Sequence, residues 1–144
     1  MKKLIIPVAL LVMNLSSCTK EEKIKGCTDI NSINYNPKAQ ESDGSCSFAG
    51  SIVFYSPKEV ADDLVSQGYT SLEYYIDDKL IGTSSANMYF KSVPNCSTQG
   101  ATTTTVSLGS SKSKSFFYSV KSSGEQLYKG TIVVEANSCN PIEL

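Results

Sequence analysis

The sequence contains no histidine, no tryptophan and no arginine, and each absence removes a class of function. Without histidine the chain lacks the commonest general base and the commonest zinc ligand, which excludes Ser-His-Asp and Cys-His catalysis. All 13 cationic side chains are lysines, and they form no cluster. Because phosphate contacts rely on clustered arginine and lysine, nucleic acid is not expected as a partner.

The N-terminal segment has the three regions of a secretory signal peptide. Residues 1–3 are cationic, residues 4–13 are apolar, and residues 14–18 are small or polar apart from Leu15. An apolar run of about ten residues is too short to cross the roughly 30 Å of hydrocarbon in a bilayer as a permanent helix. We therefore expect cleavage of residues 1–17, which removes two of the 13 lysines and moves the formal charge from -1 to -3.

The end of this segment, Leu15-Ser16-Ser17-Cys18, resembles the lipobox of bacterial lipoproteins. The resemblance implies a diacylglyceryl group on the Cys18 thiol, cleavage before Cys18 and acylation of the new N-terminus. Several acyl chains together give stable anchoring, so the lipid bilayer becomes a partner of the chain and residues 18–25 become a tether. The alternative is that Cys18 simply lies near an ordinary cleavage site.

The residues after Cys18 are Thr19-Lys20-Glu21-Glu22. They resemble a surface-export signal of lipoproteins in one group of Gram-negative bacteria, in which the acceptor cysteine is followed by any residue, a lysine and two acidic residues. The resemblance implies a lipid-anchored position in the cell outer membrane, facing the outside. A solvated charged tether has the same composition, so the inner face of that membrane is the alternative.

Four further cysteines are available for disulfides, which is how an even number is interpreted in an exported protein. They permit three pairings, and no CxxC pair is present. The spacing and the division of the chain proposed below favour Cys27 with Cys46, and Cys96 with Cys139.

Residues 26–47 form a candidate disulfide loop module. They are rich in Asn, Asp, Gly and Pro, which favour turns, and they contain very few apolar side chains. A core this small does not offset chain entropy, and a bridge closing about twenty residues contributes about 3 kcal/mol. The module resembles a short repeat of secreted and surface bacterial proteins, with these matching positions: Gly26-Cys27-Thr28-Asp29, Asn34-Tyr35, Pro37 and Asp43-Gly44-Ser45-Cys46.

Four side chains of this module are candidate ligands for Ca²⁺, which takes hard oxygen donors. They are Asp29, Asn31, Asn36 and Asp43. Only two of them are carboxylates, and Ser42 stands where the repeat often has a second aspartate. The alternative is that all four stabilise turns.

Residues 48–144 predict one mainly β domain. Apolar and polar residues alternate in short runs between turn formers, at residues 50–55, 72–76, 79–82, 86–90, 102–108, 116–120, 126–135 and 139–144. One short helix is expected over residues 57–67, with Ser56 as N-cap, Glu59 completing a capping box and Gly68 after its end. Seven or eight short strands at this spacing predict a small antiparallel β-sandwich.

This domain resembles the PEGA-like and carboxypeptidase-regulatory-like sandwiches of surface proteins, through residues 75–83, 108–120 and 128–134. These sandwiches are structural, adhesive or ligand-presenting modules. The resemblance therefore implies a non-enzymatic binding, adhesion or envelope-structural function.

Two pairs of adjacent aromatic residues on predicted strands are the candidate binding surface, because one member of each pair faces outward unless both faces are covered. The pairs are Tyr74 with Tyr75 and Phe116 with Phe117. An outward aromatic row suits an unknown surface protein or a glycan, and it favours as second function an accessory carbohydrate-binding lipoprotein of a glycan-uptake system. The alternative is packing between strands.

A small hydrolase is a third interpretation, because two carboxylates at a suitable separation hydrolyse glycosides. Its candidate acids are Asp62, Asp63, Asp77 and Asp78, which would have to converge in a cleft.

Overall fold

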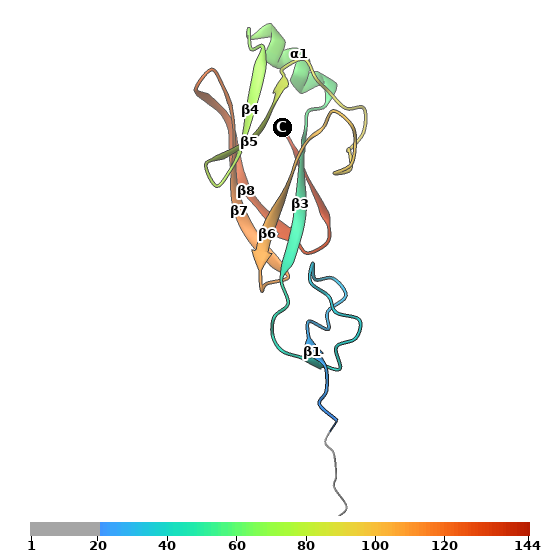
Figure 1. Ribbon diagram of the computed structural model, residues 1–144. Helices are drawn as coiled ribbons and strands as arrows, with labels where there is room; N and C mark the ends of the chain where they lie inside the picture. Colours follow the sequence, from blue (N-terminus) through green and yellow to red (C-terminus); the bar gives the residue numbers. More distant parts are fainter. Residues whose placement is uncertain (1–20) are drawn as a thin grey trace, which may run out of the picture.

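Two facing β-sheets and one short helix make up most of the chain in the computed structural model, which describes residues 21–144 (Figure 1). The first sheet has the order β6-β3-β9, with β3 spanning Phe48–Tyr55, β6 Thr102–Gly109 and β9 Cys139–Glu143. The second has the order β5-β4-β7-β8, with β4 Ser71–Ile76, β5 Lys79–Ser85, β7 Ser113–Ser122 and β8 Glu125–Glu135. This confirms the predicted mainly β sandwich, here with seven strands.

Neighbouring strands of the sandwich run antiparallel except β3 and β9, which pair in parallel from Ser51 opposite Cys139 to Tyr55 opposite Glu143. The first and last strands of the domain are therefore neighbours. This pairing joins the two ends of the domain in one sheet.

The core lies between the two sheets and is centred on Phe54, which is 1% exposed. Its ring centroid lies 4.9 Å from that of Tyr74 and 5.9 Å from that of Tyr118, both on the opposite sheet. Leu64 of the helix joins this core. Alternate residues of β4, Leu72, Tyr74 and Ile76, face inward as predicted, since side chains alternate across a strand.

The helix α1 spans Lys58–Ser66, so the predicted helix is confirmed to within one residue at each end. The predicted capping box is wrong. Pro57 is the N-cap, with extended backbone dihedral angles, and no side chain caps the helix. Ser56 therefore lies one residue before the N-cap, and its carbonyl accepts a hydrogen bond from the Phe90 N–H at 3.0 Å.

The predicted hairpin at Asp77-Asp78 is confirmed, and both residues have positive φ, 46° and 63°. This matches the type I′ geometry that suits a two-residue hairpin. The strand expected at residues 86–90 is wrong, because these residues form a turn and the start of a long loop. Ala86 is fully buried there, so its apolar character reflects packing of the loop.

The loop of residues 86–101 carries Cys96, which is bonded to Cys139 at the start of β9. β6 and β9 lie on opposite sides of β3. The loop therefore passes from Cys96, which is bonded to β9, across the sheet to the start of β6. Val53, whose neighbours Ile52 and Phe54 face the core, is 0% exposed on the other side of the sheet. Thr105 and Pro141 lie on the same side of the sheet and are exposed, so this second face is only partly buried.

The first module lies beyond the lower end of β3 (Figure 1) and contains two short paired strands, β1 (Lys25–Gly26) and β2 (Glu41–Ser42). It is closed by the Cys27–Cys46 disulfide. An ion pair joins it to the sandwich, with Lys112 Nζ 2.5 Å from Asp29 Oδ2. Within residues 21–144, no helix has the length and apolarity needed to span a membrane.

Candidate binding surface

The four aromatic residues of the candidate surface divide into an inner and an outer pair. Tyr74 and Phe116 are 3% and 5% exposed and belong to the core, so the structure removes them from any binding surface. Tyr75 is half-buried and Phe117 is 39% exposed, and neither belongs to the core. Only Tyr75 and Phe117 are left as candidates, on the outer face of the four-stranded sheet.

Two exposed aliphatic side chains extend this pair. Leu80, 50% exposed, is opposite Tyr75 in the β4–β5 pairing, and Val133, 57% exposed, is opposite Ser115, two residues from Phe117. We call Leu80, Tyr75, Phe117 and Val133 the outer row. It crosses β5, β4, β7 and β8: Leu80 is directly opposite Tyr75, whereas Tyr75 with Phe117 and Phe117 with Val133 are diagonal cross-strand neighbours.

Charged side chains contact both the ring and the hydroxyl of Tyr75. Lys121 Nζ lies 4.7 Å from the centroid of the Tyr75 ring, and the Tyr75 hydroxyl donates a hydrogen bond of 2.8 Å to Glu73 Oε2. This bond to the Glu73 carboxylate, followed by partial burial, raises the pKa of Tyr75 above its ordinary value of 10.0. With one ring face already used by Lys121, Phe117 is the more accessible aromatic ring of the outer row.

The sequence also contains a pattern that predicts outward positions for Leu80 and Val133. Each lies in a run of consecutive apolar residues, Leu80-Ile81 and Ile132-Val133-Val134. Because successive side chains of a strand point to opposite faces, such a run places at least one apolar residue outside. The argument applied to the aromatic pairs therefore finds these two as well.

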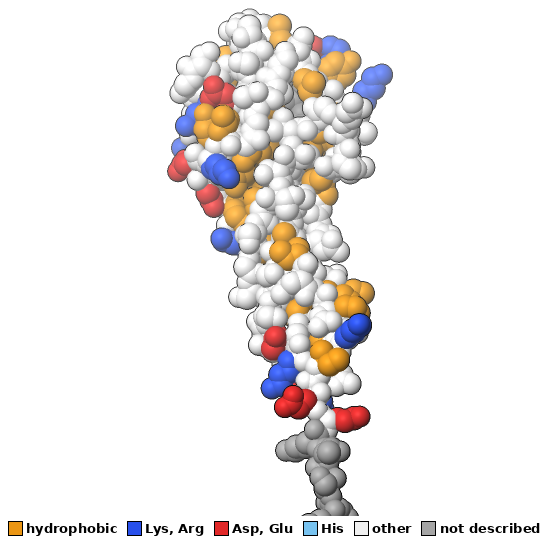
Figure 2. Space-filling model, in the orientation of Figure 1, with side chains coloured by type: hydrophobic (Ala, Val, Ile, Leu, Met, Phe, Trp, Pro, Cys, Tyr) orange, Lys and Arg blue, Asp and Glu red, His pale blue; other side chains and the backbone are white. Residues whose placement is uncertain are grey.

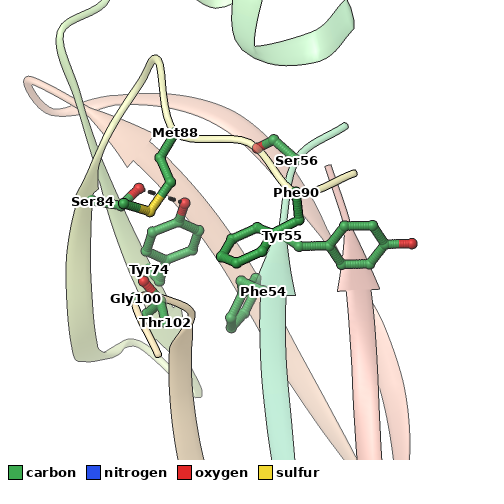
Figure 3. Close-up of a pocket in the computed structure, with 9 residues that line it drawn as sticks. All are labelled: Phe54, Tyr55, Ser56, Tyr74, Ser84, Met88, Phe90, Gly100 and Thr102. Atoms are coloured by element: carbon green, nitrogen blue, oxygen red, sulfur yellow. Dashed lines mark hydrogen bonds between the residues drawn. The ribbon is translucent and has the colours of Figure 1, made fainter. Parts of the chain in front are cut away.

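A small pocket lies beside Tyr74, where Met88, Phe90 and Gly100 of the long loop meet strands of both sheets (Figure 3). The Tyr74 and Ser84 hydroxyls are 2.9 Å apart, and the cavity of about 10 Å³ holds no more than one water molecule. Burial raises the pKa of Tyr74 above 10.0. Both hydroxyls are satisfied by each other, so the cavity is part of the packing and too small for a ligand.

Three of the four proposed calcium ligands are engaged in local bonds. Asp29 accepts the Asn31 N–H at 3.0 Å, Asn36 accepts the Lys38 N–H at 3.0 Å, and Asp43 accepts the Ser45 N–H at 2.9 Å. Asp29 also pairs with Lys112. Among residues 21–144, no three acidic or cysteine side chains gather as a metal-binding group. Calcium at Asp29, Asn31, Asn36 and Asp43 stays a prediction, tested by the melting temperature during Ca²⁺ titration.

Hydrogen bonding and charge lower the pKa values of the two aspartate carboxyls of the module. The Lys112 ammonium, then the Asn31 N–H, holds the pKa of Asp29 below its ordinary value of 3.8. The Ser45 side chain and N–H do the same for Asp43. Both carboxylates are therefore stabilised in the ionised form by protein groups.

The other predicted site residues are the cysteines and the acids considered for hydrolysis. Both predicted disulfides are present, Cys27–Cys46 and Cys96–Cys139. Cys18 lies outside the described residues. Of the acids considered for hydrolysis, Asp62 pairs with Lys58 at 2.6 Å, and Asp77 Oδ1 accepts the Phe117 N–H at 3.0 Å.

The structure also contains a groove that the sequence did not predict. It has a volume of about 390 Å³ and lies where the first module meets the three-stranded sheet. Its lining combines Ile33, which is 70% exposed, with the Cys96–Cys139 bridge and Thr105 of β6. No sequence pattern brings these residues together, since they come from three separate parts of the fold.

Comparisons of the chain with protein-family models, with curated proteins and with solved structures gave no match.

Proposed function

We propose that the chain is a lipid-anchored lipoprotein of the cell outer membrane, exposed on the outside, and that it acts as a non-enzymatic binding, adhesion or envelope-structural module. The observation that carries this is the position of the N-terminal end. Residue 21, three residues after Cys18, lies at the end of the first module farthest from α1 (Figure 1). An anchor at Cys18 would therefore present the sandwich away from the bilayer.

The disulfides support an exported module. Each bridge closes its own part of the chain, with a sequence separation of 19 for Cys27 and Cys46 and of 43 for Cys96 and Cys139. Disulfides persist in oxidising compartments, and small exported domains with little hydrophobic core are often rich in them. The fifth cysteine, Cys18, is then left for the lipid.

The anchor is tested by the Cys18→Ala variant, because removing the acceptor thiol removes the acyl chains. We expect the variant to leave the membrane fraction, whereas Thr19→Ala, which keeps the acceptor, remains there. Intact-mass analysis of the native protein should show an N-terminal acylated Cys18. Equal membrane retention of the two variants would disprove the anchor.

The outward position is tested separately by protease treatment of intact cells. Replacing Lys20, Glu21 and Glu22 by glutamine removes the charges of the export signal and leaves Cys18 in place. We expect the native protein to be digested and the triple variant to be protected while still bound to membrane. Protection of the native protein would place it on the inner face.

The second candidate, an accessory carbohydrate-binding lipoprotein, is favoured by the exposed ring of Phe117. Aromatic faces stack on sugar rings, and Phe117 lies beside polar residues of the outer face. If this candidate holds, Phe117→Ala abolishes binding on a glycan array, whereas Val133→Ala, an exposed outer-row residue without a ring, does not. Equal binding by both variants, or none by the native protein, rejects it.

A further inference from the structure

The two disulfides differ in how far solvent reaches them. Cys27 is 1% exposed, its Sγ lies 2.8 Å from the Ser32 hydroxyl, and its partner Cys46 packs against the core. In the other bridge, Cys139 is exposed and Cys96 is half-buried. A thiolate that attacks a disulfide needs access to one of its sulfur atoms, and exposed bridges are the more labile ones. The Cys96–Cys139 bridge is therefore the one that a thiol can reach.

This bridge also lines the groove of about 390 Å³ between the first module and the three-stranded sheet. The first module contributes Ile33, which is 70% exposed and offers an apolar contact. The sheet contributes hydroxyl groups, because Ser51 and Thr105 lie there with their oxygens 3.1 Å apart. A volume of this size is typical of ligand sites. The groove therefore combines a reachable disulfide with apolar and polar contacts for whatever carries the thiol.

The lining of the groove is uncharged. None of the residues that line it has an acidic or basic side chain, and residues 92–111 around Cys96 have none either. On the face seen in Figure 2, no blue or red side chain appears where the first module meets the sandwich. A charged group that entered the groove would lose hydration and gain no opposite charge. The lining therefore suits an uncharged segment with apolar side chains beside Ile33.

We propose that the Cys96–Cys139 bridge is a thiol-exchange site, which takes a cysteine of an uncharged polypeptide segment seated in this groove. The thiolate of that cysteine attacks Cys139 Sγ, and a new S–S bond joins the two chains. The bond between the sulfurs of Cys139 and Cys96 breaks, and Cys96 leaves as a thiolate that takes up a proton from water. One disulfide replaces another, so the exchange needs no oxidant or reductant.

The leaving side of the bridge is a turn that keeps its own hydrogen bonds. Asn95 Oδ1 accepts the Ser97 N–H at 2.9 Å. In the part of the chain that the structure describes, the hydrogen bonds of residues 91–101 join this segment only to itself. Exchange at Cys139 therefore releases a formed turn without breaking hydrogen bonds to the sheets. The Cys96 thiol stays near and reverses the reaction by attacking the mixed disulfide.

The test uses the full chain in detergent with Cys18→Ala, so that the two bridges contain all its cysteines and the result does not depend on the lipid anchor. The probe is the neutral peptide acetyl-Leu-Cys-Leu amide at about pH 8, where part of its thiol is ionised. Acid quenching, alkylation and peptide mapping by mass spectrometry follow each bridge over time. We expect the peptide on Cys139 and a free thiol on Cys96, formed at least about tenfold faster than any opening of Cys27–Cys46.

The groove is tested with Ile33→Ser, which removes its apolar side chain. Ile30→Ser is the matched control, because Ile30 is 74% exposed and does not line the groove. Ile33→Ser should slow the reaction with the peptide at least about threefold, since less apolar surface is buried, and Ile30→Ser should leave it unchanged. With 2-mercaptoethanol, which has no side chains to place beside Ile33, both variants should react as fast as the parent protein.

Equal rates at the two bridges, or faster opening of Cys27–Cys46, would overturn the exchange site. Recovery of the peptide on Cys96 would overturn the assignment of the attacked sulfur. The groove would be rejected as the seat of a polypeptide segment if Ile33→Ser did not slow the peptide, or if it slowed 2-mercaptoethanol by the same factor.

Discussion

At the scale of single residues, close contacts in this sandwich leave specific positions with no room for a side chain. Gly50 in β3 is the clearest case. A Cβ at this position would lie 2.5 Å from Val134 Cγ1 and against the Glu135 carbonyl, at the end of β8. The glycine lets strands of the two sheets approach each other, and a backbone carbonyl does not move aside as a flexible side chain does.

We predict that Gly50→Ala lowers the free energy of unfolding by about 1 to 3 kcal/mol, the usual cost of overpacking. Thermal and denaturant unfolding of the full chain measure it. Thr131→Ala, at an exposed position of β8, is the control and should stay within about 1 kcal/mol of the native protein. Equal stability of the two variants would show that β8 moves away at no cost.

The Asp29–Lys112 ion pair predicts a dependence of stability on acid pH. Because folding lowers the Asp29 pKa below 3.8, the ionised form stabilises the fold above about pH 3.8, and this contribution is lost as the pH falls through the folded-state pKa. We expect Lys112→Met to raise the Asp29 pKa, seen by NMR titration of its carboxyl, and to weaken the loss of melting temperature below pH 4. Lys114→Met, which removes a neighbouring lysine, is the control. An unchanged Asp29 pKa in Lys112→Met would show that the ion pair does not persist in solution.

At the scale of elements, the long loop before β6 is tied by a disulfide to the last strand of the sandwich. The Cys96–Cys139 bridge holds residues 86–101 to the start of β9, while Val53 and Tyr55 are buried on that side of β3. The Tyr55 hydroxyl donates to Glu143 of β9, and this bond raises the Tyr55 pKa. The loop thus has a structural role.

We predict that removing this bridge costs more stability than removing the other. In the loop-entropy relation the bridge of 43 residues contributes about 4 kcal/mol and that of 19 residues about 3 kcal/mol. Cys96→Ser with Cys139→Ser should therefore lower the melting temperature more than Cys27→Ser with Cys46→Ser, measured by calorimetry. The opposite order would mean that the loop keeps its place through packing alone.

The elements also show where sequence patterns succeed and fail. Helix α1 and the Asp77-Asp78 hairpin were predictable because their signals are local: helical spacing of apolar residues, and two adjacent residues that tolerate positive φ. The capping box and the strand at 86–90 failed because tertiary contacts decide both. The Ser56 carbonyl is taken by Phe90, and Ala86 is buried without belonging to a strand.

At the scale of the whole molecule, the chain is elongated, with the first module at one end and α1 at the other (Figures 1 and 2). Ile30 and Ile33 are 74% and 70% exposed, so the first module buries little apolar surface and depends on its disulfide and on turn hydrogen bonds. The proposed anchor and the outward position of the sandwich both depend on this elongated arrangement.

The sequence by itself indicated the fold class, the helix and the candidate anchor at Cys18, because periodicity and turn residues are properties of neighbouring residues, and it favoured the two disulfide pairs through cysteine spacing along the chain. Tertiary structure alone decided that Tyr74 and Phe116 are buried while Tyr75 and Phe117 face outward, that Asp29 pairs with Lys112, and that β6 is an edge strand. The reason is physical. Which face of a strand is covered, and which strand ends a sheet, depend on segments distant in the sequence.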